Sequence, residues 1–108
     1  MPLNLPGPIA EYFTAEKARD ALALARCFVD DGVVRDEGGT FSGTNAIRDW
    51  SAAAGKKFQH TVEPLSVIHR DGATIVAGRV AGDFPGSPVT LDHVFRLDGD
   101  KISSLEIR

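Results

Sequence analysis

The second half of the chain restricts the fold most, because it predicts β-strands joined by short turns. Asp71-Gly72 and Asp98-Gly99 are typical two-residue hairpin turns, and Pro85-Gly86-Ser87-Pro88 predicts another turn between them. The segments between these turns are rich in apolar and β-branched residues, as strands are. The sequence therefore predicts a four-strand antiparallel meander, with strands at 58–70, 73–84, 89–97 and 101–108.

The first half of the chain predicts helices. A helical turn at 9–13 precedes an amphipathic helix at 15–28 that begins at the cap Thr14 and ends at the turn Asp30-Asp31-Gly32. A short strand at 33–37 and a glycine-rich loop lead to a third helix, capped by Ser42 or Thr44, that ends at Gly55. Helices followed by an antiparallel sheet define an α+β domain, and the length favours a single domain over 1–108.

Composition argues against several classes of partner. The net charge is −3 and no long Lys/Arg run occurs, so we expect no nucleic-acid and no membrane partner. The single Cys27 excludes an intrachain disulfide, and no Cys/His cluster has zinc spacing, so we expect no metal. No stretch has the length of a membrane span or the pattern of a signal peptide, so we expect a cytoplasmic protein.

The turns also predict which strand residues face the helices. If Phe84 pairs with Val89 across the third turn, alternation along the two strands places one apolar set on a single face. The opposite face is mixed with apolar patches, which is typical of a dimer interface. The predicted helix-covered face carries Val76, Val80, Phe84, Val89, Leu91, His93, Phe95 and Leu97.

Two ionisable residues are predicted on this apolar face. His93 lies between Leu91 and Phe95, and Glu63 follows when the register is extended through the first turn, past a bulge site at Pro64. Burying an imidazole or a carboxylate is costly unless it has partners. His93 and Glu63 are therefore either satisfied core groups or groups of a pocket, and the pattern leaves both alternatives open.

The order of these motifs resembles the nuclear transport factor 2-like superfamily and, within it, small SnoaL-like proteins. The resemblance covers essentially the whole chain and rests on the leading helices, the acidic pair Asp36-Glu37, the segment 43–50 and the closing segment 98–102. It implies a cone-shaped curved sheet wrapped by N-terminal helices around a cavity, and a homodimer formed through the outer sheet face. Because the superfamily includes ketosteroid isomerase, polyketide cyclases, dehydratases and non-catalytic binding modules, its fold leaves the function open.

Similarity to ketosteroid isomerase implies a site. Asp36 matches the general base and Tyr12 matches the oxyanion donor of that enzyme. Asp92 matches its protonated aspartate only superficially, because the hairpin register turns Asp92 outward and places His93 in the inward position. We expect the cavity to be lined by Val34, Trp50, Glu63, Val80 and Phe95.

Three functions fit this pattern. In an enzyme, a small and largely apolar molecule enters the cavity, Asp36 moves a proton, and His93 or Tyr12 steadies the developing oxyanion without a cofactor. In a binding module, Asp36 and His93 only orient a ligand, and in a structural dimer side chains fill the cavity. The structural alternatives are that Asp36 caps the following loop and that Tyr12 and Trp50 pack in the core.

Overall fold

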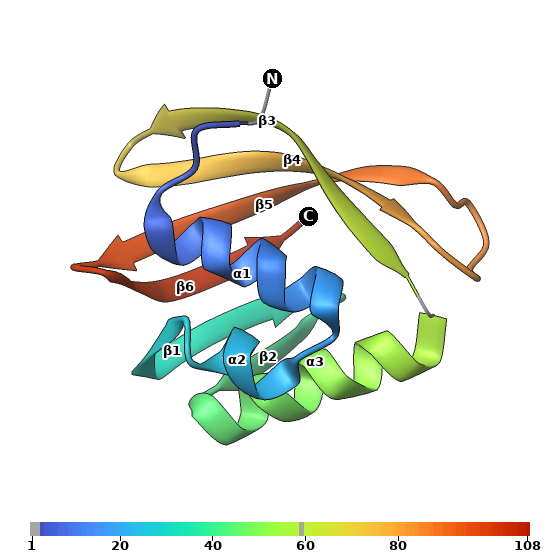
Figure 1. Cartoon of the computed structure of the whole chain (residues 1–108), viewed down its shortest axis with the longest axis horizontal. Helices are drawn as coiled ribbons and strands as arrows, with labels where there is room; N and C mark the ends of the chain where they lie inside the picture. Colours follow the sequence, from blue (N-terminus) through green and yellow to red (C-terminus); the bar gives the residue numbers. More distant parts are fainter. Residues whose placement is uncertain (1–2, 59) are drawn as a thin grey trace.

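The computed structural model describes residues 3–58 and 60–108, and within them it forms a curved six-stranded sheet covered on one face by three helices (Figure 1). The strand order is β2-β1-β6-β5-β4-β3, and every neighbouring pair is antiparallel except β1 with β6. The predicted α+β class and helix-covered sheet are confirmed. In chain order the elements are α1 (Gly7–Ala18), α2 (Ala21–Ala25), β1 (Phe28–Asp36), β2 (Gly39–Ser42), α3 (Thr44–Phe58), β3 (Thr61–Arg70), β4 (Ala73–Ala81), β5 (Val89–Asp98) and β6 (Lys101–Ile107).

The N-terminal helices differ from the prediction in where they break. Thr14 lies inside α1, where its hydroxyl donates to the Ala10 carbonyl at 3.0 Å, and it caps nothing. The chain turns at Arg19, which is left-handed with φ 56°. Asp20 then caps α2 by accepting from the Ala23 backbone N–H at 3.0 Å. The single helix predicted at 15–28 is therefore wrong, because a left-handed residue and a fresh cap divide it.

The first strand is longer than predicted. The residues Asp30-Asp31-Gly32, predicted as a turn, lie within β1. They are held there because β1 pairs in parallel with β6, a partner more than sixty residues away, through a register shift between Phe28 and Val33. Such an irregularity absorbs the unpaired residues without ending the strand.

A strand also replaces the predicted loop after Asp36. Here β2 pairs with β1 so that Asp36 lies opposite Gly39. The two residues between them, Glu37 and Gly38, both have positive φ, which is the geometry of a type I′ hairpin turn. Asp36 is consequently the last strand residue before a tight turn at the edge of the sheet.

The β4–β5 register is displaced from the prediction by four residues. Val89 pairs with Val80 and not with Phe84, because the connection spans 82–88 and is stabilised by a bond from Gly82 N–H to Ser87 Oγ at 2.9 Å. Side chains alternate with period two, so an even displacement preserves the faces. His93 therefore still points toward the helices, as predicted.

The β3–β4 register corrects the placement of Glu63. A bulge between Pro64 and Ser66 shifts the pairing by one residue, so that Val62 lies opposite Val80 and Glu63 lies opposite Arg79. A one-residue shift exchanges the two faces of a strand. Glu63 is exposed on the outer face, and Val62 takes the inward position in its place.

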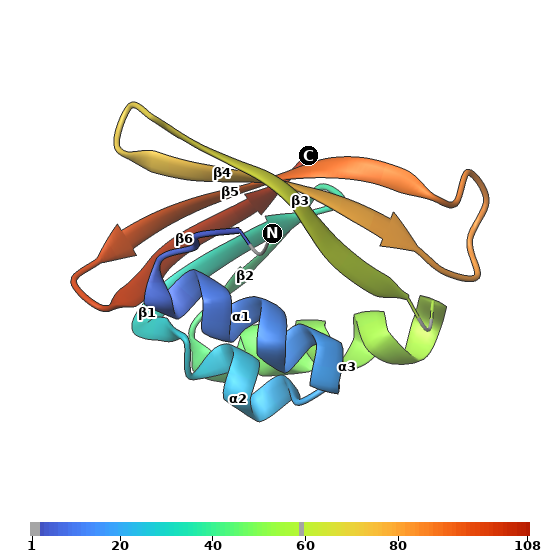
Figure 2. The ribbon, with the colours of Figure 1, turned by 45° about the horizontal axis from the view of Figure 1, so that its top comes forward.

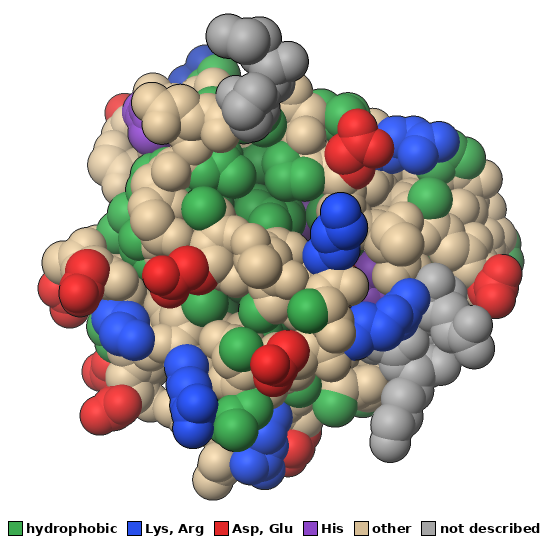
Figure 3. Space-filling model, viewed as in Figure 1, with side chains coloured by type: hydrophobic (Ala, Val, Ile, Leu, Met, Phe, Trp, Pro, Cys, Tyr) green, Lys and Arg blue, Asp and Glu red, His purple; other side chains and the backbone are tan. Residues whose placement is uncertain are grey.

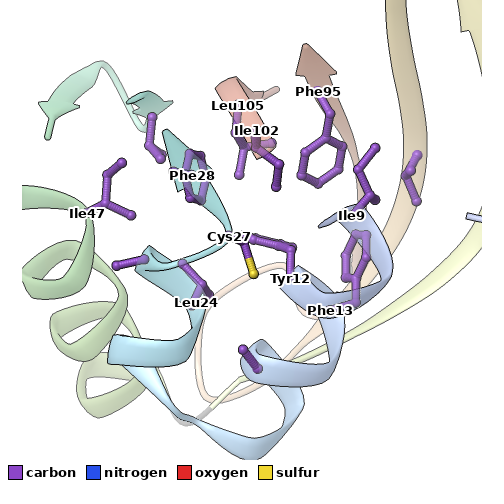
Figure 4. Close-up of a cluster of buried hydrophobic side chains, with 14 residues drawn as sticks. Ile9, Tyr12, Phe13, Leu24, Cys27, Phe28, Ile47, Phe95, Ile102 and Leu105 are labelled. Carbon is purple, nitrogen blue, oxygen red and sulfur yellow. The ribbon is translucent and has the colours of Figure 1, made fainter. Parts of the chain in front are cut away.

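The helices cover the inner face of the sheet (Figures 1 and 2), and buried side chains from both form the hydrophobic core. Tyr12 and Phe13 extend from α1 toward Phe28 of β1 and Phe95 of β5 (Figure 4). The Tyr12 ring lies edge-on to Phe13 at 5.1 Å and to Phe95 at 5.3 Å, the preferred geometry for aromatic pairs. Cys27 is buried in this core as a free thiol, as predicted.

The surface shows no charge segregation on the face in view. In Figure 3, acidic and basic side chains are interspersed among hydrophobic and neutral atoms. Among the described residues, no helix has both the length and the apolar character needed to cross a membrane.

Gly78 provides a test of the packing beneath His93. A Cβ at position 78 would lie 2.8 Å from His93 Cε1, closer than such atoms approach. We expect Gly78→Ala to lower the free energy of unfolding by about 1–3 kcal/mol through overpacking, measured by urea denaturation. Gly7→Ala is the control, because no atom lies within 4 Å of its added Cβ. Equal stability of the two variants would contradict this packing.

Candidate functional site

A cavity of about 590 Å³ opens between the concave face of the sheet and the helices. This volume lies within the range typical of small-molecule sites. Most of its wall is apolar and aromatic, with a few ionisable groups set among these residues. The lining residues are Tyr12, Glu16, Asp36, Glu37, Phe41, Trp50, Ser51, Ala53, Ala54, His60, Val62, Val80, Phe84, Pro85, Val89, Leu91, His93 and Ile107.

Asp36 lies in the cavity wall and is half-buried. Its Oδ2 accepts a hydrogen bond from Trp50 Nε1 at 3.1 Å, which fixes the carboxylate against α3. Burial raises the pKa of Asp36 above its ordinary value, and the adjacent charge of Glu37 raises it further. The Trp50 hydrogen bond, the charge of His60 and the Glu37 backbone lower the same pKa in part. The carboxylate thus combines partial desolvation with a fixed orientation, as a base requires.

Tyr12, from α1, lines the same cavity as Asp36. Its ring is packed in the core, as the structural alternative proposed, and the residue also lines the cavity. Burial raises the pKa of the Tyr12 phenol well above its ordinary value, and the charges of Glu16 and Asp36 raise it further. The phenol therefore keeps its proton, so it is a hydrogen-bond donor at neutral pH.

His93 lines the cavity from β5 and is 2% exposed. Its Nδ1 lies 3.1 Å from the Leu91 carbonyl, and because a carbonyl only accepts, Nδ1 carries the proton. Burial lowers the pKa of His93, although the Leu91 and Val76 carbonyls raise it in part, so the ring is neutral at neutral pH.

The cavity wall also contains an ion pair that the sequence did not predict. Glu16 lies one helical turn after Tyr12, and its Oε1 lies 3.1 Å from Nε2 of His60, which precedes β3. The hydrogen bond that His60 donates to the Glu16 carboxylate raises the pKa of His60, although burial opposes this effect. The four-residue spacing from Tyr12 was visible in the sequence as a shared helix face. The partner His60 was not, because only the tertiary fold brings it to α1.

The structure thus brings Asp36, Tyr12, His93, Trp50 and Val80 together around one cavity. Three other predicted residues lie elsewhere. Glu63 is on the outer face, for the register reason given above. Val34 and Phe95 are fully buried in the core and do not line the cavity, and the Tyr12 ring packs against Phe95. The lining residues that the sequence analysis did not assign to a pocket include Phe41, Val62, Phe84 and Ile107.

Comparison with known families and structures agrees with this architecture. The family model of the SnoaL-like domain matches residues 9–105. No curated protein matches the chain.

Many solved structures share the fold. A candidate polyketide cyclase of Sinorhizobium meliloti (protein SMa1630) is 39% identical with a TM-score of 0.92, and the match covers 96% of this chain and 95% of that one. A protein of Catenulispora acidiphila with a ketosteroid isomerase-like fold, in complex with trimethylamine, is 20% identical with a TM-score of 0.84, covering 97% and 86%. An NTF2-like protein of Cytophaga hutchinsonii is 11% identical with a TM-score of 0.77, covering 100% and 93%. The predicted cone-type fold is confirmed.

The raised pKa of Asp36 makes a prediction for stability. A carboxyl whose pKa is raised by folding contributes stability that is complete below its unfolded pKa, near 3.8, and is lost as the pH rises through its folded pKa. We therefore expect Asp36→Asn to be more stable than the wild type at neutral pH, with the difference shrinking as the pH falls. Chemical denaturation at several pH values measures this difference. A variant that is less stable at neutral pH would contradict the desolvation of Asp36.

Proposed function

The chain belongs to the SnoaL-like domain family, and from this premise we propose that its cavity binds a small, largely apolar molecule on which Asp36 acts as a base without a cofactor. The reaction would be an isomerisation, a cyclisation or a dehydration of the type that begins with removal of a proton from carbon. The observation that carries the proposal is the half-buried Asp36 carboxylate, held by Trp50 in the wall of an apolar cavity.

The neighbouring groups support this assignment. Once Asp36 takes the proton, the electron pair left on the substrate places negative charge on an oxygen, and the Tyr12 phenol supplies the donor for that oxygen. Neutral His93 lines the same cavity and is a second polar group that can orient a substrate. The similar candidate polyketide cyclase favours cyclisation among the three reactions.

The alternative is a binding module without chemistry. The same cavity and the same hydrogen-bonding groups would then orient a ligand, and Asp36 would affect affinity alone. The two functions differ in whether the carboxylate moves a proton, so a generic proton-abstraction reaction separates them.

Elimination from 5-nitrobenzisoxazole supplies that reaction. A base removes the C3 proton, the N–O bond breaks, and a coloured cyanophenolate forms. We expect Asp36→Asn to reduce kcat/KM at least about 100-fold, as loss of a general base does. We expect it also to retain affinity for the uncharged fluorophore N-phenyl-1-naphthylamine.

Asp92→Asn is the matched control, because Asp92 is exposed on the outer sheet face. It should leave both the rate and the affinity unchanged. Loss of affinity without any Asp36-dependent rate would support the binding module. A rate equal to that of free acetate would also contradict the proposed base.

We propose in addition that the outer sheet face forms a homodimer with a second copy of the chain. Ile68 pairs with Ile75, and Ile75 pairs with Val94, so three β-branched side chains form a row across β3, β4 and β5. Ile68 is 48% exposed and Leu65 at the bulge is 45% exposed. Such an apolar row on a sheet face is typical of a protein interface.

Sedimentation velocity tests the dimer. We expect a dimer at micromolar concentration, and we expect Ile68→Glu to give a monomer because it places a charge in the apolar row. Leu22→Glu is the control, since Leu22 is similarly exposed, at 44%, on α2, which lies on the other side of the sheet. A wild-type monomer would contradict the dimer.

A further inference from the structure

We propose that Glu16 and His60 form a positioning pair for the proton chemistry of the cavity. In this arrangement Glu16 holds a positive charge on His60, and that charge favours the ionised, basic form of Asp36. The inference rests on the proposed function above and adds two residues that act on the base rather than on the substrate.

The geometry places this pair in the cavity wall and not on the open surface. Glu16 Oε1 and His60 Nε2 are 3.1 Å apart, and their side chains are only 15% and 13% exposed. Both residues line the cavity that Asp36 also lines. A surface ion pair is screened by water, whereas a pair withdrawn from water acts on nearby groups with less screening.

The surrounding charges define the action of the pair. From α1, Glu16 favours the charged form of His60 and Arg19 disfavours it. From β1, Asp36 is the group on which the His60 charge acts, and Glu37 is its opposing neighbour. His60 is thus one of the groups that act on Asp36, and its positive charge counteracts the effect of burial on the Asp36 pKa.

Contacts of the His60 backbone and ring hold this residue in the cavity wall. The Arg19 guanidinium donates to the His60 backbone carbonyl at 3.1 Å, which ties the start of β3 to the end of α1. The His60 Nδ1 atom is buried without a hydrogen bond of full geometry among the described residues, while the Ala54 carbonyl favours the charged form of the ring. The Ala54 carbonyl thus adds to the Glu16 carboxylate in holding the proton on His60.

The experiment follows each ionisation directly by NMR titration. The Asp36 carboxyl carbon is assigned by its absence in Asp36→Asn. We expect His60→Gln to move the Asp36 midpoint to higher pH, because the positive charge is lost. We expect His60→Lys to keep it near the wild-type value, because the charge is retained. In Glu16→Gln, we expect the midpoint of His60 itself to fall.

The nitrobenzisoxazole reaction gives a second readout. In His60→Gln, the acid limb of the rate profile should move with the Asp36 midpoint, so the rate at the wild-type midpoint falls about threefold while the high-pH plateau is kept. Arg19→Gln is the control, because it removes the tether to the His60 carbonyl and leaves the ion pair. It should not raise the Asp36 midpoint.

The outcomes separate this inference from the proposed function. An Asp36 midpoint that stays unchanged in folded His60→Gln would overturn the inference, whatever the turnover. An upward shift without any Asp36-dependent turnover would remove the proposed reaction and leave the charge coupling. A purely structural clasp would lower the unfolding free energy of His60→Gln and leave the midpoint where it was. If His60→Gln does not fold, an Asp36 midpoint displaced in His60→Lys would equally overturn the inference.

Discussion

The parallel pairing of β1 with β6 is the constraint on which the rest of the molecule depends. It joins the helical first half of the chain to the last strand, with Val34 opposite Leu105 and both fully or almost fully buried. A backbone hydrogen bond from Ile102 N–H to the Cys27 carbonyl at 2.8 Å begins this connection. Because β1 follows α1 and α2 directly, the pairing also fixes these helices over the concave face (Figure 1). Without it the meander would have no cover, and Asp36 would have no cavity to face.

The cavity combines two opposing effects on its ionisable groups. Burial makes charge costly, and it accordingly keeps Tyr12 protonated and His93 neutral. The pKa of Asp36 is subject to both effects, since burial disfavours the charged form while Trp50 and His60 favour it. A carboxylate held between these effects is poised to exchange a proton, which a fully solvated or fully neutralised carboxylate is not.

Two differences between the predicted and the observed strand pairing show that register decides which side chains face the cavity. The β4–β5 displacement of four residues left His93 pointing inward, because four is even. The β3 bulge at Pro64 displaced the pairing by one residue, and this moved Glu63 out of the cavity and Val62 into it. Proline lacks a ladder donor, so a bulge there was foreseeable, but which side of Pro64 would carry the extra residue was not.

The sequence by itself determined the α+β class, the hairpin turn at Asp71-Gly72, the inward face of β5 and the position of Asp36 at the end of a strand, because these follow from local turn chemistry and from side-chain alternation. Only the tertiary structure decided that β1 lies beside β6, that Trp50 binds Asp36, and that His60 meets Glu16. These contacts join residues from 14 to more than sixty positions apart. No local pattern encodes them, since they arise when the core packs and the sheet curves around the space that remains.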